Sequence, residues 1–180
     1  DYITPDVIAD FTTIHLEDAG ANRVKVHGVR GRAPTDKLKV SISYHAGYKA
    51  VGTLVYGWPD PVKKAQEADR IVRSRLERMG FAYDDVRTEF VGWNSTHGHL
   101  AGPPPADLPE VELRIAVRAA KKEPVEAFTR EIAPLILTGP PTVTGFAGGR
   151  PRVQEIVAYW PALIDRREIE PRLRVDVVDA

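Results

Sequence analysis

The stretch VELRIAVR, residues 111–118, decides the fold class. Val111, Leu113, Ile115 and Val117 alternate with charged or small residues at every intervening position. Because successive side chains of a β-strand point to opposite faces, this period of two predicts a strand with one face in the core and the other toward solvent. Antiparallel sheets carry such half-exposed strands, whereas buried parallel strands are apolar on both faces. The stretch therefore predicts an antiparallel-rich sheet.

Two segments have the apolar spacing of amphipathic helices. Asp60 and Pro61 are a typical helix start, as N-cap and first helical residue, and Gly80 is a typical stop. The apolar stripe of this first helix consists of Val62, Ala65, Ala68, Val72, Leu76 and Met79. A second helix is predicted from Pro124 to just before Thr138. Its buried face consists of Val125, Phe128, Ile132, Leu135 and Ile136.

Alternating patterns predict further strands at 38–44, 50–56 and 86–93, with a hairpin loop at 45–49. Residues 23–27 alternate in the same way over a shorter distance. A short helix over 151–160, stopped by Pro161, and a last strand over 173–177 complete the expected elements.

From about residue 50 the main order is strand, helix, strand, strand, helix, strand, which is typical of the ferredoxin-like split βαβ arrangement. We therefore expect one α+β domain over residues 1–180, with helices on one face of an antiparallel-rich sheet. Residues 1–49 would form an irregular or β N-terminal segment with a hairpin strand. Residues 50–180 would form the ferredoxin-like core, which includes a glycine-rich loop at 139–150.

Composition excludes several classes of function. The chain has 180 residues with 25 basic and 25 acidic side chains, so it lacks the positive field that nucleic acid or an anionic membrane requires. It contains no cysteine, which excludes disulfides, thiolate zinc sites and a cysteine nucleophile. No apolar run approaches the roughly 20 residues of a membrane-spanning helix. We expect an intracellular protein with no metal.

The first residue is Asp1 and the only methionine is Met79. This indicates a piece of a longer polypeptide, in which the missing N-terminal half would be a partner of the present chain.

The loop LTGPPTVTGFAGGRPRVQE, residues 137–155, is the first candidate site. Glycines reach positive φ easily, so successive backbone N–H groups can form an anion-binding nest beside a helix N-terminus. A phosphate or carboxylate would suit this arrangement, and the alternative is a plain connector between two packed helices. The candidate anion-binding residues are Thr142, Thr144, Gly145, Gly148, Gly149 and Arg150.

Two weaker candidates carry catalytic side chains. His97 and His99 are the only close pair of histidines, and either can serve as a general base. An exposed polar loop is the favoured interpretation, because zinc sites need three or four ligands. Asp6 and Asp10 are spaced to share a helix face, although Thr4 and the residues after it are also an ordinary helix start.

Several segments occur together in an order that resembles one known family. They are TPDVIADF (4–11), GVRG (28–31), KVSISY (39–44) followed by Gly47, TEFVG (88–92), and LTGP (137–140) through Gly149. The chain is similar to the later part of the large N-terminal domain of the acyclic terpene utilisation proteins.

The resemblance implies cytoplasmic catabolism of acyclic isoprenoids such as citronellol and geraniol, whose intermediates are carried as coenzyme A thioesters. We expect a protein that acts on or binds an acyl-CoA or carboxylate intermediate, with coenzyme A as part of the substrate and no separate cofactor. The alternative is a non-catalytic assembly domain of a larger catabolic protein. A homo-oligomer is expected in either case, and the resemblance carries over no catalytic residue.

Overall fold

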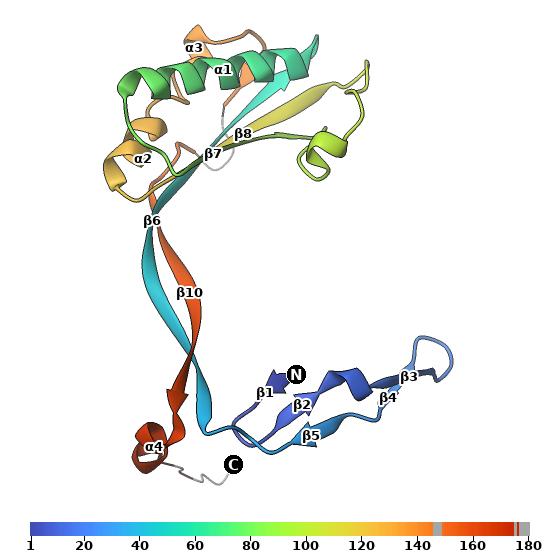
Figure 1. The fold of residues 1–180 in the computed structure, drawn as a ribbon. Helices are drawn as coiled ribbons and strands as arrows, with labels where there is room; N and C mark the ends of the chain where they lie inside the picture. The colour runs from blue at the N-terminus through green and yellow to red at the C-terminus, as the bar shows by residue number, and fades with distance from the viewer. Residues whose placement is uncertain (146–148, 175, 177–180) are drawn as a thin grey trace. The chain divides into compact units, whose positions relative to one another are not determined.

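The computed structural model describes residues 1–145, 149–174 and 176. The chain divides into two compact units, residues 1–44 with 159–180 (unit 1) and residues 45–158 (unit 2). Two long strands, β6 (Lys37–Gly57) and β10 (Gln154–Asp165), contribute residues to both units (Figure 1). The fold is α+β with antiparallel sheets and few helices, as the alternating stretch predicted.

The sheet of unit 2 is built around the stretch that opened the sequence analysis. That stretch lies in β8 (Glu110–Ala119), which pairs antiparallel with β6 on one side and with β7 (Asp85–Val91) on the other. The strand order is β10–β6–β8–β7, and the short β9 (Val143–Thr144) also pairs antiparallel with β6. The ferredoxin-like arrangement with helices on one face stays a prediction.

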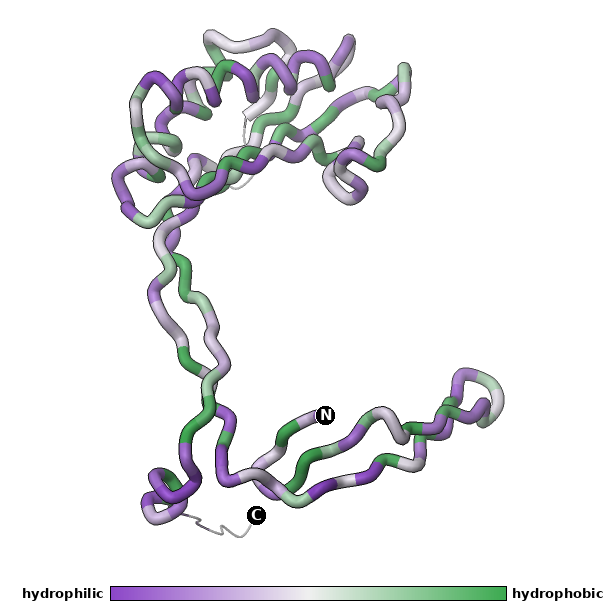
Figure 2. The backbone as a smooth tube through the Cα atoms, viewed as in Figure 1, coloured by the Kyte–Doolittle hydropathy of each residue, from purple (hydrophilic) through white to green (hydrophobic). Residues whose placement is uncertain are grey.

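Helix α1 (Pro61–Met79) begins and ends where the sequence predicted. Its buried residues include Val62, Ala65, Ala68, Val72 and Leu76, and hydrophilic residues alternate with them along the helix (Figure 2). Gly80 follows with φ +70°, the left-handed conformation of a helix C-terminus. Asp60 stands at the N-cap position, but its side chain makes no capping hydrogen bond.

The predicted second helix is wrong as a single element. It is broken into α2 (Lys122–Thr129) and α3 (Leu135–Thr138). Pro134 explains the break, because a proline inside a helix removes a hydrogen bond and its ring clashes with the carbonyl four residues earlier. Four residues of the predicted buried face are nevertheless buried, namely Val125, Phe128, Ile132 and Leu135. Both α1 and α2 pack against β8.

Two predictions for the C-terminal part of the chain, the helix over 151–160 and the strand over 173–177, are also wrong. Residues 151–160 do not form a helix, since β10 runs through them and pairs with β6. Pro161 lies within β10, which is tolerated because β10 is the outer strand of its sheet. No strand begins at Leu173, the first residue of the strand predicted over 173–177. Leu173 instead follows the short helices α4 (Arg166–Ile169) and η3 (Glu170–Arg172). Residues 175 and 177 lie outside the described residues.

The hairpin loop expected at 45–49 is wrong as well, because β6 is continuous from Lys37 to Gly57. Gly47 has φ +99°, and a Cβ there would lie 2.6 Å from the backbone oxygen of Ala119. The glycine thus allows β6 and β8 to approach closely, and the chain does not reverse.

Unit 1 consists of short strands and few helical turns. β1 (Tyr2–Ile3), β2 (Ile8–Asp10) and β5 (Arg30–Arg32) form one antiparallel sheet. β3 (His15–Asp18) and β4 (Val24–His27) form a separate hairpin, which confirms the short strand predicted at 23–27. No helix starts at Thr4, whose hydroxyl instead donates to the Asp6 carboxylate at 2.8 Å. The only helical turn nearby is η1 (Phe11–Thr13).

The hydrophobic core lies in unit 2. Its fully buried side chains come from β6, β8 and the helices that cover them, and include Leu54, Tyr56, Val72, Leu113, Ile115, Phe128 and Ile132. In the described part of unit 1, by contrast, only Ile8 is buried. Among the described residues, no helix combines the length and the apolar composition that crossing a membrane requires.

Candidate functional site

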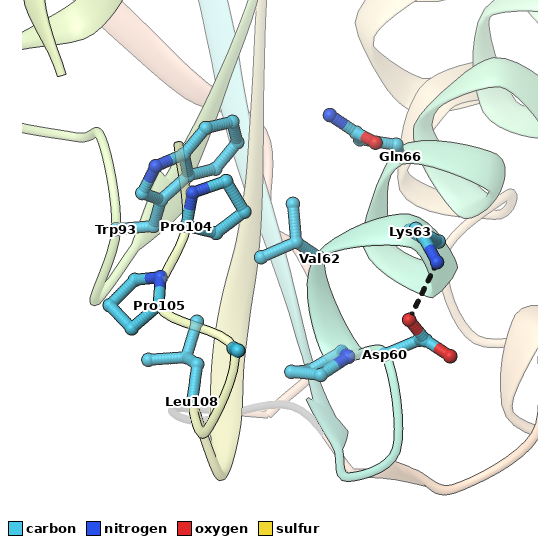
Figure 3. A pocket seen from close by; sticks show the side chains of 10 residues that line it. Asp60, Val62, Lys63, Gln66, Trp93, Pro104, Pro105 and Leu108 are labelled. Carbon is cyan, nitrogen blue, oxygen red and sulfur yellow. Dashed lines mark hydrogen bonds and ion pairs between the residues drawn. The ribbon is translucent and has the colours of Figure 1, made fainter. Parts of the chain in front are cut away.

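A cavity of about 380 Å³ lies between the first turns of α1 and the β7–β8 connection of unit 2 (Figure 3). One wall is α1, which contributes Val62, Lys63 and Gln66, together with Asp60 just before the helix. The facing wall is formed by Trp93, Pro104, Pro105, Ala106 and Leu108. The volume falls within the range of small-molecule sites, about 300–1,000 Å³.

Trp93 is held firmly in the turn that follows β7. Its indole Nε1 donates to the backbone oxygen of Gly102 at 2.9 Å, and its ring packs on Phe90 with a centroid separation of 5.8 Å. Its backbone N–H donates to the Phe90 carbonyl at 3.1 Å. Because both the ring and the backbone are anchored, the indole presents a fixed apolar surface to the cavity.

The rest of the apolar lining is equally rigid. Pro104 and Pro105 have fixed φ angles, and Val62 is buried at the start of α1. The two ends of the site are tied together where the Trp58 N–H donates to the Pro109 carbonyl at 2.7 Å. A cavity with stiff walls loses little side-chain entropy when an apolar ligand enters it.

Polar groups occur on the α1 side of the cavity. The Lys63 ammonium donates to the Asp60 carboxylate at 2.8 Å, and this contact holds the pKa of Asp60 below its usual value. An ammonium group carries three donors, so Lys63 keeps donors for a ligand after bonding to Asp60. Gln66, one turn further on, is exposed and adds an amide. The arrangement suits a ligand with an apolar body and one polar end.

The candidate residues of the glycine-rich loop differ in where they lie and in what they bond to. Thr142, with φ +62°, is used within the fold: its hydroxyl donates to the Gly57 carbonyl at 3.0 Å and accepts from Lys64. Thr144 lies in β9 and its hydroxyl donates to the Gly145 carbonyl. Gly149 has φ +85°, and Gly148 lies outside the described residues.

Arg150 lines a second cavity, of about 440 Å³, with Arg130, Thr129, Ala133, Pro134, Leu137 and Pro151. The loop is not followed by a helix, so the helix-dipole part of the anion-nest argument was wrong. The structure supplies a second guanidinium instead, because Arg130 directly follows α2 and lines the same cavity. Two arginines in one cavity remain a suitable pair for a carboxylate or phosphate.

The histidines and Asp10 belong to different units. His97 and His99 are exposed in the turn around η2 (Gly98–Leu100), which belongs to the β7–β8 connection. Asp10 lies in unit 1 and caps η1, accepting from the Thr12 hydroxyl at 2.6 Å and from the Thr12 N–H at 3.0 Å. These bonds lower the pKa of Asp10. Within the described residues, no group of three or more metal-ligating side chains occurs.

Sequence reasoning missed the cavity at Trp93. It predicted the start of α1 at Asp60 and Pro61 but assigned no ligand to it. The available signal was Trp93, close to the end of a predicted strand and ten residues before the proline cluster at 103–105.

One comparison with known proteins gives a match. The family model described as "Acyclic terpene utilisation family protein AtuA" matches residues 1–175. No curated protein and no solved structure matches the chain significantly. Because the family match covers nearly all of the 180 residues, it confirms the resemblance carried by the short motifs. The chain belongs to the acyclic terpene utilisation family AtuA.

Proposed function

We propose that the protein binds an acyclic terpenoid carboxylate or its coenzyme A thioester, with the isoprenoid chain in the cavity at Trp93. Family membership implies a part in acyclic terpene utilisation, and the cavity supports the choice of ligand. The single observation that carries the proposal is the rigid apolar lining of Val62, Trp93 and Leu108 beside the polar pair Asp60 and Lys63.

An acyclic terpenoid has the chemistry that this lining would accept. Its chain is apolar and branched, so its methyl groups can pack on an indole face and on proline rings. Its oxidised end is a carboxylate or thioester, which the Lys63 ammonium and the Gln66 amide can meet with hydrogen bonds. The apolar part of the ligand would supply affinity, and the polar end would fix its direction.

Arg130 and Arg150 extend the proposal to the coenzyme A part of a thioester. The pair lines a cavity of about 440 Å³ in the same unit of the fold. Guanidinium groups bind phosphate oxygens bidentately, which makes this cavity the favoured place for an anionic group of the ligand.

The test measures binding by calorimetry with citronellate, geranate and their coenzyme A thioesters. We expect Trp93→Ala to weaken binding of all of them about tenfold or more, since a lost aromatic contact and its buried area are worth at least about 1.4 kcal/mol. Arg150→Ala should weaken only the coenzyme A thioesters, again about tenfold, because a charge-assisted bond contributes roughly 1.5–3 kcal/mol.

Trp160→Ala is the matched control, because Trp160 is an exposed tryptophan of unit 1 that does not line the cavity. Absence of binding at millimolar ligand, or equal affinity of the Trp93→Ala and Trp160→Ala variants, would overturn the proposal. Activity assays with the same compounds would show whether turnover accompanies binding.

A further inference from the structure

Unit 1 has almost no interior of its own. In its described residues only Ile8 is buried, at 8% exposure, whereas all the other buried hydrophobic side chains of the described chain lie in unit 2. Folding orders the backbone at an entropic cost of about 1–2 kcal/mol per residue, which burial of apolar surface must offset. A unit with one buried side chain cannot meet this requirement alone, so another surface must cover part of it.

The β3–β4 hairpin (Figure 1) carries exposed apolar side chains on one of its faces. In its register Leu16 lies opposite Val26 and Asp18 opposite Val24, so Leu16, Val24 and Val26 share one face. These three side chains are 69%, 63% and 58% exposed. An isolated two-stranded hairpin is marginal in water, and three or more strands with an apolar face are needed for stability.

The opposite face of the hairpin is polar. His15 stacks on His27, with a centroid separation of 5.5 Å, and Glu17 lies 2.7 Å from His27 Nε2 and 3.2 Å from Lys25 Nζ. Both outer edges of this two-stranded sheet are open, because neither strand pairs with another described strand. Open edges are sites at which a further strand can add.

We propose that the hairpin is completed by a second copy of the chain, which pairs antiparallel along β3 about Leu16. Two-fold symmetry then places Leu16 opposite its own copy and His15 opposite Glu17 of the second copy, twice. Leu16 and Val26 of both copies form one apolar row across four strands. On the polar face, each Glu17 carboxylate lies between Lys25 and the second copy's His15.

Charge complementarity favours β3 over β4 as the shared edge. Pairing of β4 about Val26 would set the Lys25 ammonium opposite the second copy's His27 and not opposite a carboxylate, and pairing about Lys25 would set two ammonium groups together. Opposed like charges destabilise cross-strand pairs, whereas opposite charges stabilise them. Residues 1–44 contain six acidic and six basic side chains, so the two copies do not repel each other as a whole.

The absence of cysteine makes a disulfide test direct. Directly opposed residues of an antiparallel pair have Cα atoms about 4.5–5.5 Å apart, which suits a disulfide. In the full chain, Leu16→Cys should therefore give a covalent dimer on mild oxidation. Val24→Cys is the matched control: it lies on the same face of the hairpin with similar exposure, but on the strand away from the shared edge, and should stay uncrosslinked.

Sedimentation velocity of the unmodified chain should show a dimer at micromolar concentration. His15→Glu should raise the dimer dissociation constant about two- to thirtyfold, because it sets two carboxylates together at two symmetric places. A monomer at these concentrations would overturn the proposal, since the occupant would then be a different molecule or segment. Equal or faster crosslinking of Val24→Cys, or unchanged dimerisation of His15→Glu, would overturn the β3 register.

Discussion

Gly52 lies where β6, the segment after α2 and the glycine-rich loop meet, and the space around it predicts the effect of Gly52→Ala. An added Cβ would lie 2.5 Å from Ile132 Cγ1, 3.0 Å from Ile132 Cδ1 and 3.1 Å from Pro151 Cγ. Carbon atoms at rest lie about 3.5–4.0 Å apart, so Ile132 would have to move by about 1 Å. Ile132 is 1% exposed within a close-packed core and has little room to move.

The expected cost follows from two opposing effects. Overpacking a core by one methyl group costs about 1–3 kcal/mol. Replacement of glycine by alanine also reduces the entropy of the unfolded chain, which returns about 0.4–1 kcal/mol. We therefore expect Gly52→Ala to lower the free energy of unfolding by about 1–2 kcal/mol.

A double-mutant cycle with Ile132→Ala isolates the clash. Ile132→Ala alone should cost about 2–5 kcal/mol, because it opens a cavity in the core. In that background Gly52→Ala should cost nothing or stabilise, since most of its steric conflict is gone. Urea unfolding followed by tryptophan fluorescence measures all four proteins, with constant m-values as the control for two-state behaviour. An equal cost of Gly52→Ala in both backgrounds, or no cost in the wild type, would refute the reasoning.

Three further predictions concern single side chains. The Tyr56 hydroxyl is fully buried, has no hydrogen-bond partner among the described residues, and its pKa is raised by burial to about 12. Tyr56→Phe should therefore leave the free energy of unfolding unchanged or raise it by up to about 1–3 kcal/mol, measured by urea unfolding. A clearly lower free energy of unfolding would show that the hydroxyl has a partner. Arg73 joins α1 to β7 by donating to the Val86 carbonyl at 3.0 Å and to the Thr88 hydroxyl at 2.7 Å, beside Asp69. Arg73→Met should cost about 1–3 kcal/mol of unfolding free energy, whereas the exposed control Arg70→Met should cost less than about 1 kcal/mol, and equal costs would contradict the assignment. Hydrogen bonds from Arg167 and then Lys37 hold the pKa of Asp165 well below its usual value. The ionised form thus contributes stability fully above the unfolded pKa of about 3.9 and loses it as pH falls through the folded pKa. Asp165→Asn should therefore reduce the fall in melting temperature as the pH is lowered. An unchanged dependence of the melting temperature on pH would exclude Asp165 as its source.

Local periodicity determined the elements whose burial pattern is unambiguous. The strict alternation from Val111 to Val117 allows only a half-buried strand, and the stripe from Val62 to Leu76 only an amphipathic helix. Both were predicted correctly because each pattern spans enough residues to separate a period of two from one of 3.6. The family, too, was recognisable from short motifs in order.

Residues 151–160 show where local pattern is insufficient. Ile156, Val157 and Trp160 have spacings that a short helix also allows, and the stop signal at Pro161 strengthened that interpretation. In the structure the segment is a strand because β6, about a hundred residues earlier, offers it an edge to pair with. Pairing with a distant strand satisfies the backbone hydrogen bonds, and no local pattern reports whether such a partner exists.

For the candidate site, too, the sequence predicted the local features but not which residues come together. The sequence by itself determined that Arg150 follows a loop of glycines, that Asp60 and Pro61 begin a helix, and that a strand ends close to Trp93, although β7 stops two residues earlier, at Val91. Only the tertiary structure decided that Arg150 and Arg130 line one cavity, that Thr142 is bonded to the end of β6, and that Trp93 faces Val62 across another cavity. The physical reason is distance along the chain: propensity and periodicity act over a few residues, whereas the walls of a cavity come from segments that meet only when the sheet has formed.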